Sequence, residues 1–98
     1  MKNITRYKSI EIKRTGEKLL RLYLREHEGL IADIIISGDF FIMPEEGIDS
    51  IESSLRGAPI DADHLGKVLA ERINRDKIDF VGITEDTIIS AIMQVAQE

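Results

Sequence analysis

Cysteine and tryptophan are absent from this sequence. Without cysteine the chain can form no disulfide, has no thiolate nucleophile and lacks cysteine ligands for zinc. This composition fits a protein of the reducing cytoplasm, which is where we expect it to reside. Aromatic residues make up only 5% of the chain, so we expect an aliphatic core built mainly of isoleucine and leucine.

Targeting and membrane signals are also missing. The sequence does not open with a charged segment followed by an apolar one, and no apolar run reaches the ~18 residues of a membrane span. The formal charge of −5 argues against a nucleic-acid binder that works by bulk electrostatics. The 98 residues form one predicted domain, residues 1–98, which is long enough for one core without disulfides.

Signatures of catalysis and cofactor binding are missing as well. Neither a GxxxxGK[ST] phosphate loop nor a GxGxxG motif occurs. The two histidines, His27 and His64, are far apart and have no third ligand nearby, so we interpret both as solvated residues. Ser53 and Ser54 lack an adjacent base, which a nucleophilic serine needs. We therefore predict no catalytic, cofactor-binding or metal-binding residue in this chain.

The most apolar stretch is Leu30–Met43, which follows Gly29 and ends before Pro44. It predicts a β-strand with a tight bend at Gly38-Asp39. By strand alternation, one face holds Leu30, Ala32, Ile34 and Ile36, and the other holds Ile31, Ile35 and Ser37. Asp33 interrupts the second face, so we expect that face to be only partly covered.

Two further strands precede this stretch. Tyr7–Arg14 and Lys18–Glu28 both alternate between apolar and polar residues, while Met1–Ile4 is interpreted as a loose lead-in. In the first strand, Ile10 and Ile12 point one way. The inward positions of the second strand are Leu20, Leu22 and Leu24. Because the turns are too short for crossovers, the three strands must form antiparallel hairpins.

The second half of the chain predicts helices. The first opens at Pro44-Glu45-Glu46 and ends before Gly57. Asp61 or Asp63 caps the second, whose apolar stripe comprises Leu65, Val68, Leu69 and Ile73. After a connector at Asp79–Ile83, Thr84 caps the last helix, with Ile83 and Ile88 in the positions of a hydrophobic staple. The predicted fold class is α+β: a three-stranded antiparallel β-meander covered by about three α-helices.

Three local features are candidates for function. Asp39 follows a turn glycine, and we favour a bend in which its carboxylate accepts backbone N–H groups over a ligand contact. Phe40 and Phe41 should point to opposite sides, so that one enters the core and the other is either an exposed partner anchor or covered by a helix. Lys18 follows a turn, so its ammonium projects toward a partner's site or simply into solvent.

Several short motifs together resemble a known family. They are Gly16-x-Lys18-Leu19, Gly29-x-Ile31, Ile36-Ser37-Gly38-Asp39-Phe40-Phe41, Ile51-Glu52-x-x-Leu55-x-Gly57 and Phe80-x-Gly82-Ile83. From about Lys8 to Ile92 the chain resembles the C-terminal accessory domain of lipoate–protein ligases. It is most similar to the archaeal arrangement, in which this domain is a separate small subunit. That family often has a second glycine before the lysine, where this chain has Glu17.

The resemblance implies a non-catalytic subunit that forms a heterodimer with a catalytic lipoate–protein ligase subunit. The catalytic subunit carries the lipoate and ATP sites, and ATP and Mg²⁺ are co-substrates of the complex. Lipoate is activated to lipoyl-AMP and then transferred to a lysine on a lipoyl carrier domain. The accessory chain is needed for the activation step and has no activity alone.

We expect the partner interface to include Lys18, Gly38, Asp39, Phe40 and Phe41, because these motif positions have no obvious role in the core. The alternative is a small cytoplasmic α+β module, unrelated to ligation, that binds other proteins or self-associates through its exposed sheet face. An independent enzyme is disfavoured because the sequence offers no nucleophile, base or metal set.

Overall fold

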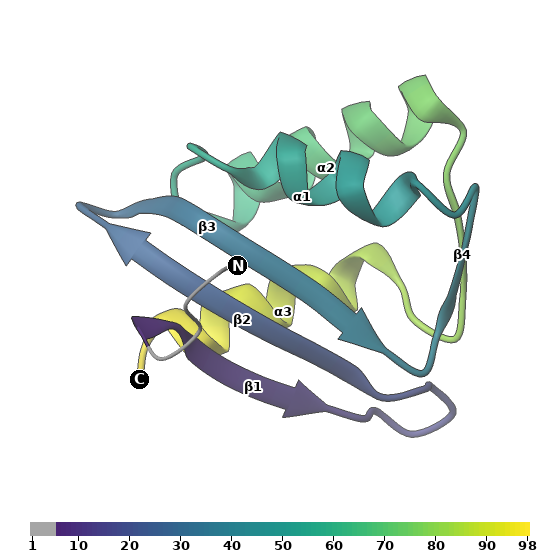
Figure 1. The fold of residues 1–98 in the computed structure, drawn as a ribbon, viewed down its shortest axis with the longest axis horizontal. Coiled ribbons are helices and arrows are strands. Elements are labelled where there is room, and N and C mark those ends of the chain that lie inside the picture. The colour runs from purple at the N-terminus through teal and green to yellow at the C-terminus, as the bar shows by residue number, and fades with distance from the viewer. Residues whose placement is uncertain (1–5) are drawn as a thin grey trace.

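The first half of the chain is an antiparallel meander, as predicted. The computed structural model describes residues 6–98, so the predicted lead-in Met1–Ile4 lies outside the described residues. The strands are β1 (Lys8–Ile12), β2 (Leu20–His27) and β3 (Leu30–Gly38), paired in the order β1-β2-β3 (Figure 1). Each is shorter than the alternating stretch that predicted it, because the strand ends turn away to form the connecting loops.

Strand β2 shows the predicted division into two faces. Leu20, Leu22 and Leu24 are buried in the core. In β1, Ile12 pairs with Leu20 and Ile10 pairs with Leu22, which places both isoleucines on the same face of the sheet. The other face of β2 carries Arg21, Tyr23 and Arg25, as the alternation predicts.

The predicted faces of β3 are wrong at the start of the strand. Arg25 pairs with Asp33 but Glu26 pairs with Ile31, so Ala32 has no partner and forms a β-bulge. A bulge shifts the alternation of side chains by one residue. Ile31 therefore joins Ile34 and Ile36 in the core, whereas Leu30 is 41% exposed.

The predicted strand Leu30–Met43 is two strands rather than one. β3 ends at Gly38, and β4 (Phe41–Met43) belongs to a separate sheet with β5 (Asp79–Val81), a segment predicted as a connector. Gly38 has a φ of +150° and Asp39 N–H donates to the Leu19 carbonyl at 2.9 Å, so the main chain leaves the first sheet there. The predicted bend is confirmed, and it also ends the strand.

The three predicted helices are confirmed. They are α1 (Gly47–Leu55), α2 (Ala62–Asp76) and α3 (Glu85–Ala96). Asp61, not Asp63, caps α2 by accepting His64 N–H at 2.8 Å. Thr84 caps α3 in a reciprocal capping box with Thr87.

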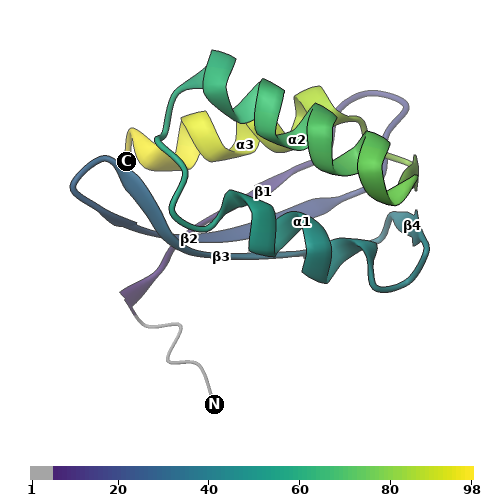
Figure 2. The ribbon, with the colours of Figure 1, turned by 90° about the horizontal axis from the view of Figure 1, so that it is seen from above.

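The helices cover only one face of the three-stranded sheet. Figure 2 shows α2 and α3 on one side of the sheet and α1 along the β3 edge. α3 packs on β1 and β2, α1 packs on β3, and α2 packs against both helices. The buried hydrophobic residues between these layers are leucine, isoleucine, valine and alanine, which confirms the predicted aliphatic core. Within residues 6–98, no helix has the length and apolar character needed to cross a membrane.

Candidate functional site

Three segments that are distant in sequence meet at one end of the three-stranded sheet. The Lys18 backbone N–H donates to the Gly82 carbonyl at 2.7 Å, and Leu19 accepts the N–H of Asp39. The β1–β2 loop is therefore held between the β3–β4 corner and the segment that leads into α3. The structure brings the predicted residues Lys18 and Gly38–Phe41 together at this end.

Two glycines allow this close approach. A Cβ atom on Gly38 would lie 2.1 Å from the carbonyl oxygen of Leu19. At Gly82, where φ is +102°, a Cβ atom would lie 2.6 Å from Cγ of Lys18 and 3.5 Å from Cβ of Phe40. A side chain at Gly38 would displace the backbone of Leu19, and one at Gly82 would displace the side chain of Lys18.

Of the two adjacent phenylalanines, one packs against the core and the other is exposed, as predicted, although only Phe41 belongs to β4. Phe40 is half-buried against the core, whereas Phe41 is 70% exposed. Phe41 pairs with Val81 and lies two residues before Met43, so all three side chains share one side of the small sheet. Val81 is 58% exposed and Met43 is 65% exposed. We call Phe41, Met43 and Val81 the β4–β5 apolar face.

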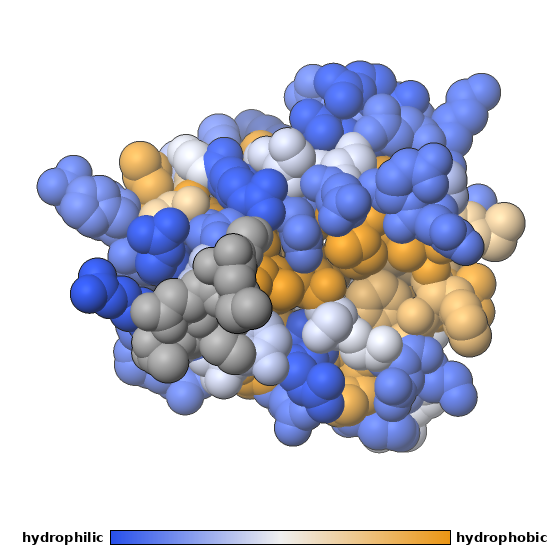
Figure 3. Space-filling view, in the orientation of Figure 1, coloured by the Kyte–Doolittle hydropathy of each residue, from blue (hydrophilic) through white to orange (hydrophobic). Residues whose placement is uncertain are grey.

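This apolar face is visible at the surface. In Figure 3, hydrophobic residues gather over β4 and continue inward between α1 and β3. Large apolar side chains that cluster on a surface mark sites of interaction more often than single exposed ones do. Phe41 was predicted from the sequence as a candidate for partner contact, whereas Met43 and Val81 were not. The sequence signal that could have identified Val81 is the alternation in Asp79–Val81, which is recognisable as a strand only when its pairing with β4 is known.

Lys18 stands beside this face as an exposed cation. Two arginines at the sheet are in ion pairs: Arg21 on β2 with Glu11 at 2.7 Å, and Arg56, which follows α1, with Asp33 at 2.7 Å. Among the residues that the structure describes, no carboxylate lies within ion-pair distance of Lys18. An apolar centre with charged groups at its rim is the usual anatomy of a protein interface.

Asp39 does not act as predicted. Its carboxylate is exposed and accepts no hydrogen bond from the described part of the chain, so the prediction that it satisfies backbone N–H groups is wrong. The bend is made by the main chain instead, through the Gly38 conformation and the Asp39 N–H. The Asp39 side chain is left exposed at this corner, and its negative charge acts on Arg21 of β2.

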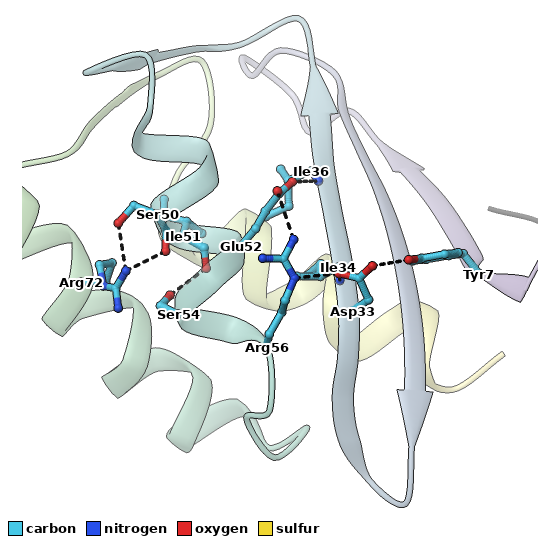
Figure 4. A network of polar contacts seen from close by, with 10 residues as sticks. All are labelled: Tyr7, Asp33, Ile34, Ile36, Ser50, Ile51, Glu52, Ser54, Arg56 and Arg72. Atoms are coloured by element: carbon cyan, nitrogen blue, oxygen red, sulfur yellow. Dashed lines mark hydrogen bonds and ion pairs between the residues drawn. The ribbon is translucent and has the colours of Figure 1, made fainter. Parts of the chain in front are cut away.

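A second polar cluster lies along the outer edge of β3 (Figure 4). Asp33 and Glu52 are both buried. Asp33 accepts the Ile34 N–H at 2.9 Å, and Glu52 on α1 accepts the Ile36 N–H at 2.7 Å. These carboxylates satisfy donors on an edge strand, and the Arg56 guanidinium compensates their charge. The cluster therefore joins α1 to the sheet.

The same cluster predicts a pH effect on Tyr7. The Tyr7 hydroxyl donates to Asp33, and this hydrogen bond, with desolvation and the negative charge of Asp33, raises the pKa of Tyr7 above its ordinary value. A raised folded-state pKa means that this stabilisation is complete below the unfolded pKa and is lost as pH rises through the folded value. Replacing Asp33→Asn should return the pKa of Tyr7 toward its ordinary value.

This shift can be measured by titrating the ¹³Cζ resonance of Tyr7 in both proteins. Tyr7→Phe assigns the resonance, since only the Tyr7 signal is then lost. Coincident titration curves for the original chain and Asp33→Asn would contradict the assignment of the hydrogen bond.

The histidines and serines lie where ordinary surface residues lie. His27 and His64 are exposed, and the Ser54 hydroxyl donates to the Ile51 carbonyl within α1 at 2.7 Å. Across residues 6–98, no three histidine, cysteine, aspartate or glutamate side chains are grouped so as to hold a metal ion.

Comparisons with known proteins give a consistent result. Residues 8–92 match the family model described as the bacterial lipoate protein ligase C-terminus. Lipoate-protein ligase A subunit 2 of Thermoplasma acidophilum is 46% identical over 43 residues, which are 44% of this chain and 46% of that protein. The aligned stretch therefore spans less than half of this curated relative.

A solved structure is similar over a longer stretch. It comes from a structural analysis of an archaeal lipoylation system, a bi-partite lipoate protein ligase and its E2 lipoyl domain from Thermoplasma acidophilum. One of its chains superimposes with a TM-score of 0.76 and 30% sequence identity. The likeness covers 88% of this chain and 93% of that one.

Proposed function

This chain belongs to the lipoate protein ligase C-terminal family, and from that premise we propose that it is the accessory, non-catalytic subunit of a two-chain lipoate–protein ligase. The observation that carries the proposal is the likeness to a chain of a bi-partite ligase, which extends over most of both chains. In this role the chain is required for activation of lipoate to lipoyl-AMP by a separate catalytic subunit. Transfer to a carrier-domain lysine depends on it much less.

The residues present support placing ATP and Mg²⁺ on the catalytic subunit. The sequence has no phosphate loop, and the described residues contain no cluster of metal-ligating side chains. When bound there, Mg²⁺ and ATP supply charge neutralisation and an adenylyl group for the carboxylate of lipoate. What this chain contributes is a rigid surface.

That surface would assist activation in two physical ways. Adenylate formation brings an anionic carboxylate against an anionic phosphate, and the acyl-adenylate product is hydrolysed by water. A cap that orders the loops of the partner and excludes water would assist with both difficulties. Opening of the same cap would admit the carrier domain for transfer.

We assign the contact with the catalytic subunit to Lys18, Gly38, Asp39, Phe40 and Phe41, extended by the rest of the β4–β5 apolar face. Phe41, Met43 and Val81 supply exposed apolar area, and Phe40, which directly precedes β4, packs against the core. The Lys18 ammonium is exposed at the rim, where it attracts negative charge on the partner. Gly38 sets the corner that presents these groups together.

Reconstitution tests the proposal. We expect the catalytic subunit from the same organism to form lipoyl-AMP about 10²-fold faster when this chain is added, because ordering of reacting groups commonly has effects of that size. Transfer from preformed lipoyl-AMP to a lipoyl carrier domain should change little. The two steps are measured separately, by ATP–pyrophosphate exchange with lipoate and by lipoylation of the carrier domain.

Lys18→Ala should stimulate lipoyl-AMP formation by the catalytic subunit less than the original chain does. The matched control is Lys67→Ala, on the exposed surface of α2, which should stimulate this reaction like the original chain. Two results would contradict the proposal: turnover of ATP and lipoate by this chain alone, or full activity of the catalytic subunit without it.

A further inference from the structure

The loop that carries Lys18 is tied by side chains to the start of α3. The Arg14 guanidinium lies 3.0 Å from Oδ2 of Asp86 and 2.6 Å from Oγ of Ser90. The Thr87 hydroxyl donates to Oε1 of Glu17 at 2.8 Å. These contacts join residues at least 70 positions apart in sequence. They connect the loop to one helix end, which also forms part of the core.

The Glu17–Thr87 contact is the best anchored of these. Thr87 is fully buried, and its hydroxyl also accepts the Thr84 N–H at 3.2 Å in the capping box. The Glu17 carboxylate therefore lies at the N-terminal end of α3, where the helix dipole favours negative charge. The Glu17 N–H itself donates to the Arg14 carbonyl at 2.9 Å, which closes the turn.

The loop is also held on either side of Glu17, by the Arg14 contacts before it and by the main-chain bonds of Lys18 and Leu19 after it. Gly16 is exposed with a φ of +81° and no atom within 4 Å of the space that a Cβ would occupy. Because glycine has no side chain, Gly16 allows the loop many backbone conformations, both in the unfolded chain and when the loop opens locally. The Lys18 N–H donates to the Gly82 carbonyl, and Lys18 directly follows Glu17 in the chain. A fixed Glu17 therefore acts together with the Gly82 bond to restrict the conformations open to Lys18.

We propose that Glu17 is a positioning residue, which, through its hydrogen bond with buried Thr87, holds the β1–β2 loop so that Lys18 faces the catalytic subunit. This inference rests on the proposed function, because it concerns the same face. Glu17 itself touches no reacting atom. Its contribution is to hold Lys18 in one orientation within the assembled complex, and such positioning raises the rate of activation rather than the affinity between the subunits.

The first test uses this chain alone and therefore does not depend on the catalytic subunit. In Glu17→Ala, amide hydrogen exchange at Lys18 should be about tenfold faster than in the original chain, because loss of one anchoring hydrogen bond favours local opening. Glu17→Gln keeps an acceptor oxygen and should restore slow exchange. Glu11→Ala, which removes an exposed carboxylate paired with Arg21, is the matched control and should leave Lys18 exchange unchanged.

The second test uses the complex with the catalytic subunit. Glu17→Ala should lower kcat for lipoyl-AMP formation about tenfold and leave the Kd between the subunits within about twofold. Glu17→Gln should restore most of the rate. Thr87→Val should slow the reaction at least as much, since it also removes the acceptor of the Thr84 N–H, and the double variant Glu17→Ala/Thr87→Val should be no slower than Thr87→Val, in which the bond to Glu17 is already lost.

The outcomes separate the two proposals. Unchanged Lys18 exchange in Glu17→Ala, or an unaltered kcat in the complex, overturns the positioning role and leaves the proposed function intact. A parallel loss of affinity and rate that Glu17→Gln does not restore also overturns it, because that pattern indicates a direct contact or a folding defect. Failure of the original chain to stimulate the catalytic subunit overturns the proposed function and is seen before any variant is assayed.

Discussion

Replacing Gly38 by alanine is expected to lower the free energy of unfolding by about 2–6 kcal/mol, since backbone strain and overpacking each cost about 1–3 kcal/mol. The added Cβ would lie 2.1 Å from the Leu19 carbonyl oxygen, which is main chain and cannot rotate away. The φ of +150° is also unfavourable for any residue with a side chain. Urea denaturation measures the loss, and Tm should fall by about 20 °C for a chain of this size.

Gly29→Ala is the control that isolates the steric part of this effect. Gly29 also has a positive φ, +78°, but nothing lies within 4 Å of the position of its Cβ. It should therefore lose only the cost of the backbone conformation, about 1–2 kcal/mol. Equal losses in the two variants would contradict the argument that the contact between Gly38 and Leu19 fixes the corner.

Much of the fold was predictable because the signals are local. The alternation of Leu20, Leu22 and Leu24 depends only on the neighbours of each residue, and so do the caps at Asp61 and Thr84. Short turns then leave antiparallel pairing as the only option. These features predicted the three-stranded meander and the three helices, and the structure confirms both.

The features that were predicted wrongly depend on contacts across the chain. The bulge at Ala32 changes which face Ile31 occupies, and nothing in the apolar run marks an unpaired residue. β4 and β5 are three residues each and lie far apart in sequence, so neither is recognisable before their pairing is known. Short strands gain their stability from tertiary pairing rather than from local preference.

The candidate site was likewise predictable only in part. Lys18 and the Gly38–Phe41 corner stood out because no core role explained them, and the structure places them side by side. Glu17 stood out only as a departure from the pattern of similar ligases. Its partner, Thr87, lies on a helix 70 residues later, so its contact could be found only in the folded chain.

Phe41→Ser is expected to weaken binding of the catalytic subunit by about 30-fold or more, the effect typical of a central aromatic anchor in an interface. Phe41 is 70% exposed in this chain, so the same change should lower the free energy of unfolding by less than about 1 kcal/mol. Isothermal titration calorimetry gives the affinity, and urea denaturation gives the stability. A large loss of affinity with little loss of stability is what an interface residue produces and a core residue does not.

Leu30→Ser provides the matched control for this prediction. Leu30 is also an exposed apolar residue, at 41%, but it begins β3 at the end of the strand opposite to Gly38. It lies outside the β4–β5 apolar face, so Leu30→Ser should leave the affinity within about twofold. Because both variants remove exposed apolar area, only the location of the side chain distinguishes them. If Phe41→Ser binds as tightly as the original chain, or Leu30→Ser is equally weakened, the catalytic subunit does not dock on the β4–β5 apolar face.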